Sequence, residues 1–112
     1  MTRYLISFDD GAMIFPEEDG PAVDAAAHAV VREAQDAGVW IFGGGVERQQ
    51  ASIVATDGMV THGPYPETKA VVGGFAIVDV PSREEALQWA AKFAGACRCA
   101  QEVREIMFDP LV

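Results

Sequence analysis

The chain has 112 residues, half of them hydrophobic and 22% charged, which is typical of one compact domain over residues 1–112 and not of a disordered chain. Seventeen acidic residues against eight basic ones give a net charge of −9. The basic residues are scattered singly, so binding to nucleic acid or to an anionic membrane surface is not expected. No stretch has the roughly 20 apolar residues that a membrane span needs. The two cysteines, Cys97 and Cys99, are too close in sequence for a relaxed disulfide, so we expect reduced thiols in a cytoplasmic protein.

The first half of the chain predicts a strand, a helix and a second strand. Residues 3–8, "RYLISF", are rich in strand formers and end in the turn "DDG". A helix is expected from about Pro21 to Ala37, because proline is favoured at the first helical position. One face of this helix is apolar at helical spacing: Val23, Ala27, Val30 and Ala34. Gly38 ends the helix, and "VWIFGGG" at 39–45 is the next strand.

The second half predicts a hairpin, a buried strand, a helix and a last strand. The strands 51–56 and 59–62 flank Asp57-Gly58, which indicates a two-residue hairpin turn. "GFAIVDV" at 74–80 is the buried strand. Ser82 and Glu85 form a capping box that starts a helix running to about Ala94, and residues 101–108 close the chain as a strand. The apolar face of this helix is expected to hold Ala86, Leu87, Ala90, Phe93 and Ala94.

The order β-α-β-β-β-β-α-β predicts an α+β, ferredoxin-like fold: an antiparallel sheet with two helices on one face. In "VWIF" and "FAIV" apolar side chains point to both faces, whereas a sheet with one wet face alternates. Two helices cover only one face. We therefore expect a second copy of the chain to cover the other, giving a homodimer, a dimeric α/β barrel, with a partly enclosed pocket.

The segment "HGPYPETKAVVGG" at 62–74 is too elaborate for a simple connection. With the strand after it, it resembles the signature of the YCII-related superfamily in its DGPF branch, which has Asp-Gly-Pro-Phe, a spacer, Glu-Thr-Lys and a Gly-Gly-aromatic entry into a strand. Two residues depart from that pattern: Tyr65 stands for phenylalanine, and His62 for aspartate. The matching residues are Gly63, Pro64, Glu67, Thr68, Lys69, Gly73, Gly74 and Phe75.

The resemblance implies a small dimeric α/β barrel that binds a small polar organic molecule. Some relatives are isomerase-like or dehalogenase-like, and some are associated with extracytoplasmic-function sigma factors. Two hypotheses stay open: an enzyme performing acid–base chemistry without a cofactor, and a non-catalytic ligand-sensing or regulatory module.

The candidate catalytic residues are His28, Asp24 and His62. The resemblance implies His28, because relatives have a histidine at the matching helix position. Asp24 lies one helical turn earlier, so its carboxylate is spaced to hydrogen-bond the imidazole. The alternative is an ordinary surface histidine beside an acid.

The candidate ligand-binding residues are Tyr65, Glu67 and Lys69 of the 62–69 loop, with Asp9 at the end of the first strand. The loop groups would supply a base and a cationic anchor. The alternative is that they only stiffen the loop or shape a turn.

No cofactor or metal is expected. Gly43-Gly44-Gly45 is not followed by a helix, so it lacks the phosphate-binding helix terminus of a dinucleotide fingerprint. We interpret it as a bulge or strand end that another backbone approaches closely. Two histidines and scattered acids give no ligand spacing for a metal.

Overall fold

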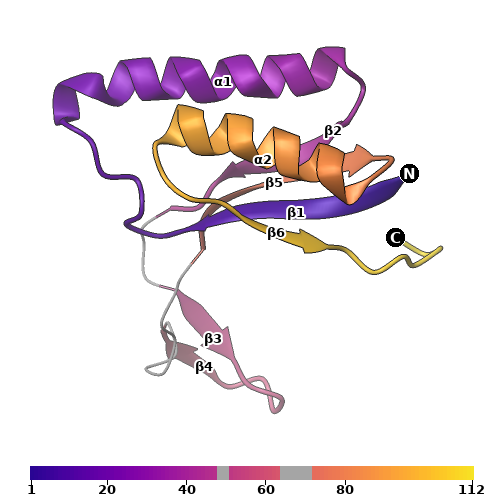
Figure 1. Cartoon of the computed structure of the whole chain (residues 1–112). Coiled ribbons are helices and arrows are strands. Elements are labelled where there is room, and N and C mark those ends of the chain that lie inside the picture. The colour runs from indigo at the N-terminus through magenta and orange to yellow at the C-terminus, as the bar shows by residue number, and fades with distance from the viewer. Residues whose placement is uncertain (48–50, 64–71) are drawn as a thin grey trace.

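The computed structural model describes residues 1–47, 51–63 and 72–112. The elements in chain order are β1 (Thr2–Asp9), the short 3₁₀ turn η1 (Glu17–Asp19), α1 (Gly20–Asp36), β2 (Trp40–Gly45), β3 (Ser52–Val54), β4 (Val60–His62), β5 (Val72–Val80), α2 (Arg83–Cys97) and β6 (Glu102–Glu105). The main sheet has the order β2-β5-β1-β6 with every neighbouring pair antiparallel. Both helices lie on one face of it (Figure 1). This is the expected α+β arrangement of ferredoxin-like type.

The core lies between this sheet and the two helices. Every second residue of β5 is buried, as expected for a strand with one covered face, and Val78 and Val80 are completely inaccessible to solvent. Ile6 of β1 packs in the same cluster with 1% of its surface exposed. The helices contribute mainly small residues, which lets them lie close to the sheet: Val30 and Ala34 from α1, and Ala86, Ala90 and Phe93 from α2.

The start of α2 is as predicted, but its end and its buried face differ. The Ser82 hydroxyl accepts a hydrogen bond from the Glu85 backbone N–H at 3.3 Å, so it caps the first turn. The helix continues to Cys97, beyond the predicted Ala94, and ends where Arg98 takes the left-handed conformation at φ 58°. Leu87 is 46% exposed, so its assignment to the apolar face was wrong. Neither described helix is long and apolar enough to span a membrane.

The hairpin of β3 and β4 has a three-residue turn and not the predicted two-residue one. The N–H of Ala55 donates to the carbonyl of Met59 at 2.8 Å, and the N–H of Gly58 donates back to Ala55 at 2.9 Å. Gly58 has φ +87°. A left-handed glycine after a tight turn is the usual three-residue solution. The hairpin projects away from the main sheet on the side opposite the helices (Figure 1).

The last strand is shorter than the predicted 101–108. β6 covers Glu102–Glu105, and one further bond ties Ile106 N–H to the carbonyl of Arg3 at 2.9 Å. Beyond it the chain leaves the sheet, so its end is not buried. The exposed apolar side chains there are Met107, Phe108, Leu111 and Val112.

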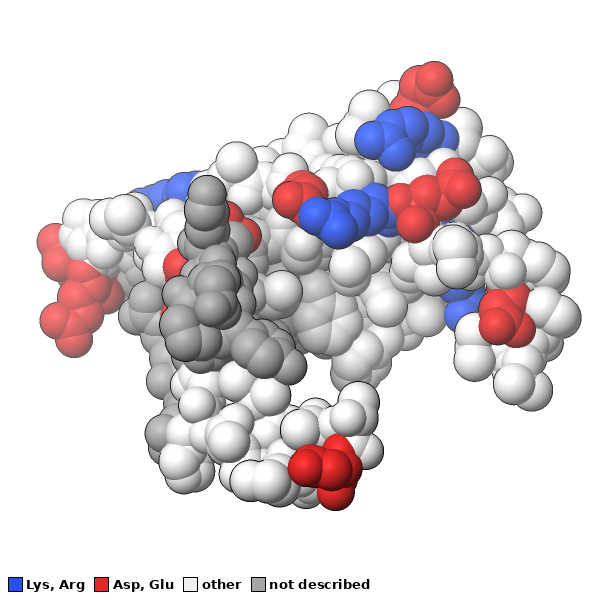
Figure 2. Space-filling view, turned by 90° about the horizontal axis from the view of Figure 1, so that it is seen from below, with Lys and Arg blue, Asp and Glu red and all other residues white. Residues whose placement is uncertain are grey.

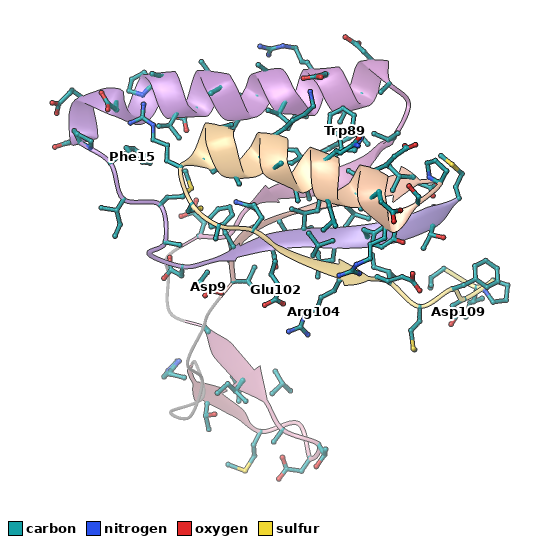
Figure 3. All side chains as sticks on the ribbon, viewed as in Figure 1. Asp9, Phe15, Trp89, Glu102, Arg104 and Asp109 are labelled. Carbon is teal, nitrogen blue, oxygen red and sulfur yellow. The ribbon has the colours of Figure 1, made fainter. Side chains whose placement is uncertain are left out.

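The second face of the main sheet carries no described helix and is largely apolar. We call it the open face. Phe42 lies opposite Ile77, and its ring contacts that of Phe75 with 6.0 Å between centroids; 63% of Phe42 is exposed. Seen from this side, large areas carry no charged side chain (Figure 2). Its charges include Glu102 and Arg104 on β6, which project away from the helices and pair with each other (Figure 3).

The glycine run of β2 contains a true close approach, as expected. A Cβ atom on Gly43 would lie 2.5 Å from the Phe75 carbonyl oxygen and 2.9 Å from the Ala76 Cα, distances that real structures do not tolerate. At Gly44 the same atom would meet nothing within 4 Å. The bulge in this strand lies earlier, between Trp40 and Phe42.

The two glycines therefore predict opposite stability effects. Gly43→Ala should lower the free energy of unfolding by about 1–3 kcal/mol, because the backbone of β5 must move to admit the methyl group. Gly44→Ala should be neutral or stabilise by up to about 1 kcal/mol, because it restricts the unfolded chain without a clash. Urea denaturation of both variants checks this. Equal midpoints would contradict the close approach.

Candidate functional site

A cavity of about 330 Å³ lies between the glycine end of β2, the neighbouring part of β5 and the two helices. It is open to solvent on one side and its walls are mainly apolar. Its size suits a single-ring organic molecule. The described residues that line it are Phe8, Met13, Ala27, His28, Val31, Trp40, Gly43, Gly44, Gly45, Phe75, Ala76, Phe93, Cys97 and Gln101.

Aromatic side chains shape this cavity. Trp40 packs against Phe93 with 6.3 Å between ring centroids. Phe8 lies across β5, where a Cβ on Gly74 would come within 2.6 Å of its ring. The missing side chain at Gly74 is therefore what lets the Phe8 ring pack closely against the strand. Such walls favour a flat ring as the ligand.

His28 is one of two titratable side chains among the described lining residues. It lies in the middle of α1, beside Ala27 and one turn before Val31, both also in the lining. Its side chain is exposed to solvent. An imidazole that is both exposed and part of the lining stands at the rim, where it can exchange protons with a bound molecule and with water.

Cys97 is the other titratable lining group, and it is buried at the end of α2. Burial raises the pKa of the Cys97 thiol, and the neighbouring Cys99 raises it further. Burial also raises the pKa of Cys99. The side-chain amide nitrogen of Gln101 donates to the Cys99 carbonyl at 3.4 Å, and the side-chain oxygen of Gln101 takes no part in this bond. Near neutral pH both cysteines are therefore neutral thiols and weak nucleophiles.

The structure places the other predicted catalytic residues away from this cavity. Asp24 lies one turn before His28 on α1 and is exposed, but no hydrogen bond joins the two described side chains. His62 is the last residue of β4, paired with Ser52 in the projecting hairpin and exposed. The cavity therefore brings His28 together with Cys97 and Gln101, and not with Asp24 or His62.

The predicted ligand-binding residues are only partly within the described structure. Asp9 ends β1 with an exposed side chain, outside the cavity lining, and its carbonyl accepts a turn bond from Ala12 at 3.1 Å. Tyr65, Glu67 and Lys69 lie outside the described residues. Within residues 1–47, 51–63 and 72–112 no group of three or more His, Cys, Asp or Glu side chains could hold a metal ion.

A second hollow of about 430 Å³ lies on the open face, between the sheet and the C-terminal segment. Asp79 of β5 is at its lining, directly opposite Arg3 of β1 in the strand register. One carboxylate oxygen of Asp79 is buried without a hydrogen-bond partner in the described structure. Leaving such a group unpaired costs about 1–3 kcal/mol, so this surface is suited to receive a hydrogen-bond donor.

Sequence reasoning missed several lining residues. Phe8, Met13 and Gln101 carried no signal, because only the tertiary fold brings these distant segments together. Cys97 had one: it follows Ala90 and Phe93 at the i+7 and i+4 helical spacing that marks the buried face of α2. The helix was predicted to end too early to include it.

Among solved structures, the chain is similar to a 5-chloro-2-hydroxyhydroquinone dehydrochlorinase from Burkholderia phenoliruptrix AC1100, in complex with 2,5-dihydroxybenzoquinone. The two share 18% sequence identity, with a TM-score of 0.54 over 97% of this chain and 96% of the other. At that identity the likeness concerns the fold. No curated protein matches the chain. The model of the YCII-related domain matches residues 3–107, so the chain belongs to the YCII-related domain family.

Proposed function

We propose that the chain binds a neutral, hydroxylated single-ring molecule in the 330 Å³ cavity and that His28 transfers a proton to or from it without a cofactor. The observation that carries the proposal is the cavity itself: aromatic walls of ring size with one imidazole at the rim. No described lining residue carries a permanent charge. Because burying an unpaired charge is costly, a neutral ring fits these walls better than an ion.

The reaction class that suits this arrangement is isomerisation or elimination on an activated ring. In an elimination of HCl, the base takes a proton and the chloride leaves with its bonding electron pair, so no external oxidant or reductant is needed. The dehydrochlorinase of similar fold supports this choice of class. General acid–base catalysis by one positioned side chain typically contributes about 10²–10⁴ in rate.

The two histidines of the chain allow a matched test of this role. His28→Gln should bind 1,3-dihydroxybenzene within about threefold of wild type, measured by isothermal titration calorimetry. It should lose about 100-fold or more of chloride release from 5-chloro-2-hydroxyhydroquinone. His62→Gln should retain both properties.

Loss of chloride release in His62→Gln alone would contradict the assignment to His28. Absence of saturable ring binding by the wild-type protein would overturn the proposed function.

One observation favours a second function, a ligand sensor: no described acidic group orients the His28 ring by a hydrogen bond. Ring binding with no chemical change in the ligand would support that function.

The proposed functional unit is a homodimer packed through the open face. That face exposes Phe42 and Ile41, and it holds the unpaired Asp79 oxygen. A second copy would bury these apolar side chains, each worth roughly 1.5–3 kcal/mol when fully covered. It would also present polar groups to Asp79. The dimer would be the α/β barrel expected from the sequence.

Charge on the open face should therefore separate the subunits. Wild-type protein should sediment at twice the 12.0 kDa chain mass, and Phe42→Asp at the mass of a single chain. Phe42 is already 63% exposed, so the substitution should leave the protomer folded. The control Leu87→Asp, on an exposed position of α2, should remain dimeric. A wild-type monomer at micromolar concentration in analytical ultracentrifugation would contradict the dimer.

A further inference from the structure

The cavity is bounded on one side by three consecutive residues without side chains. Gly43, Gly44 and Gly45 end β2, and all three contribute to the lining. β2 is an edge strand of the main sheet. The cavity therefore reaches bare backbone at the rim of the sheet.

The three glycines are not equivalent, because alternate residues of a strand face opposite sides of the sheet. Gly43 pairs with buried Ala76 and Gly45 with Gly74, whereas Gly44 pairs with Phe75 of the open face. Gly43 and Gly45 thus share the face that looks toward the helices. Gly44 has the opposite orientation.

On the helix side, described atoms occupy the space at Gly43 but not the space at Gly45. A Cβ at Gly43 would lie 2.7 Å from the Trp40 ring, whereas a Cβ at Gly45 would meet no atom of the described residues within 4 Å. Neither glycine has a positive φ, so a side chain at Gly45 would be unstrained. Gly45 is therefore the position where the absence of a side chain keeps part of the cavity open.

The backbone of Gly45 also has polar groups at the edge of the sheet beside that space. The N–H of Val46 donates to the Gly73 carbonyl at 2.9 Å. This bond makes Gly45–Gly74 a non-hydrogen-bonded pair of the antiparallel ladder. The N–H and C=O of Gly45 then point away from β5, in the plane of the sheet and toward its free edge, where no described strand pairs with them.

We propose that Gly45 determines which molecules the cavity accepts. Its missing side chain sets the space for one ring, and its N–H and C=O at the adjacent free edge can bond a hydroxyl substituent that extends past the edge of the sheet. This inference rests on the proposed ring-binding function and assigns the residue that limits ligand size. A branched side chain at position 45 would fill the part of the cavity next to the sheet and so reduce the room for a ring.

The test compares Gly45→Val with Gly95→Val, which adds the same side chain at an exposed position of α2 outside the cavity lining, where a Cβ would also meet no described atom within 4 Å. Both variants are made in a Cys99→Ser background, so that Cys97 is the only thiol. The first measurement needs no ligand: the rate at which 4,4′-dithiodipyridine, a neutral ring reagent, forms a mixed disulfide with Cys97 and releases pyridinethione. The second is calorimetric binding of 1,3-dihydroxybenzene. Urea denaturation establishes that both variants are folded.

Gly45→Val should slow the Cys97 reaction about tenfold or more and weaken ring binding about tenfold or more, as expected when side-chain atoms occupy a hydrophobic pocket. Gly95→Val should change both by less than about twofold. An unchanged Cys97 rate in folded Gly45→Val, or an equal loss in Gly95→Val, would overturn the inference. If Gly45→Val slows the Cys97 reaction while no protein binds 1,3-dihydroxybenzene, the steric role of Gly45 stands and the proposed ring-binding function fails.

Discussion

The main sheet is apolar on both faces, and the described part of the chain covers only one of them with helices. On the covered face, Ile6, Val78 and Val80 exclude solvent almost completely. Phe75 and Ile77 alternate along β5 with the buried residues, and both helices lie on the opposite face of the sheet from the open face (Figure 1). Burial of apolar surface is the dominant favourable term in folding and in association, so a partner on the open face would complete the same core that the helices begin.

This one-sided cover also accounts for the position of the cavity. Small residues let the helices approach the middle of the sheet, as at Ala34, Ala86 and Ala90. Toward the end of β2 the sheet itself becomes bare at Gly43–Gly45, and the space there is walled by larger rings such as Trp40 and Phe93. Among the described residues, the cavity thus arises from a change in side-chain size along the layer between the sheet and the helices.

Much of the fold was readable from the sequence, because local signals and the global arrangement agree. The hydroxyl of Ser82 caps α2 as its spacing to Glu85 predicts, and the two-sided apolar character of "VWIF" and "FAIV" is real. The errors have local causes. The hairpin turn has one residue more than predicted because Gly58 takes a left-handed conformation. Helix α2 extends to Cys97 and ends at Arg98, which takes a left-handed backbone conformation that an arginine side chain does not predict.

The site was less predictable than the fold, because a cavity depends on register between distant segments. His28 was identified through resemblance, but the sequence could not pair it with Phe8 or Gln101 from opposite ends of the chain. Spacing suggested Asp24 as its partner, although one helical turn of separation fixes only the backbone positions and leaves both side chains free to point into solvent.

The net charge of the chain and the residues that line its cavity differ in character, and this difference bears on which ligand the proposed function favours. The chain carries a net charge of −9, yet the described residues that line the cavity include no Asp, Glu, Lys or Arg and contribute thiol, amide and imidazole groups beside the apolar walls. An anionic ligand would approach against the field of the protein and then lose its hydration without a described countercharge. A neutral ring meets neither cost. In the proposed function, the side chains that line the cavity, and not the sheet and helices, would therefore set the preference for a neutral ring.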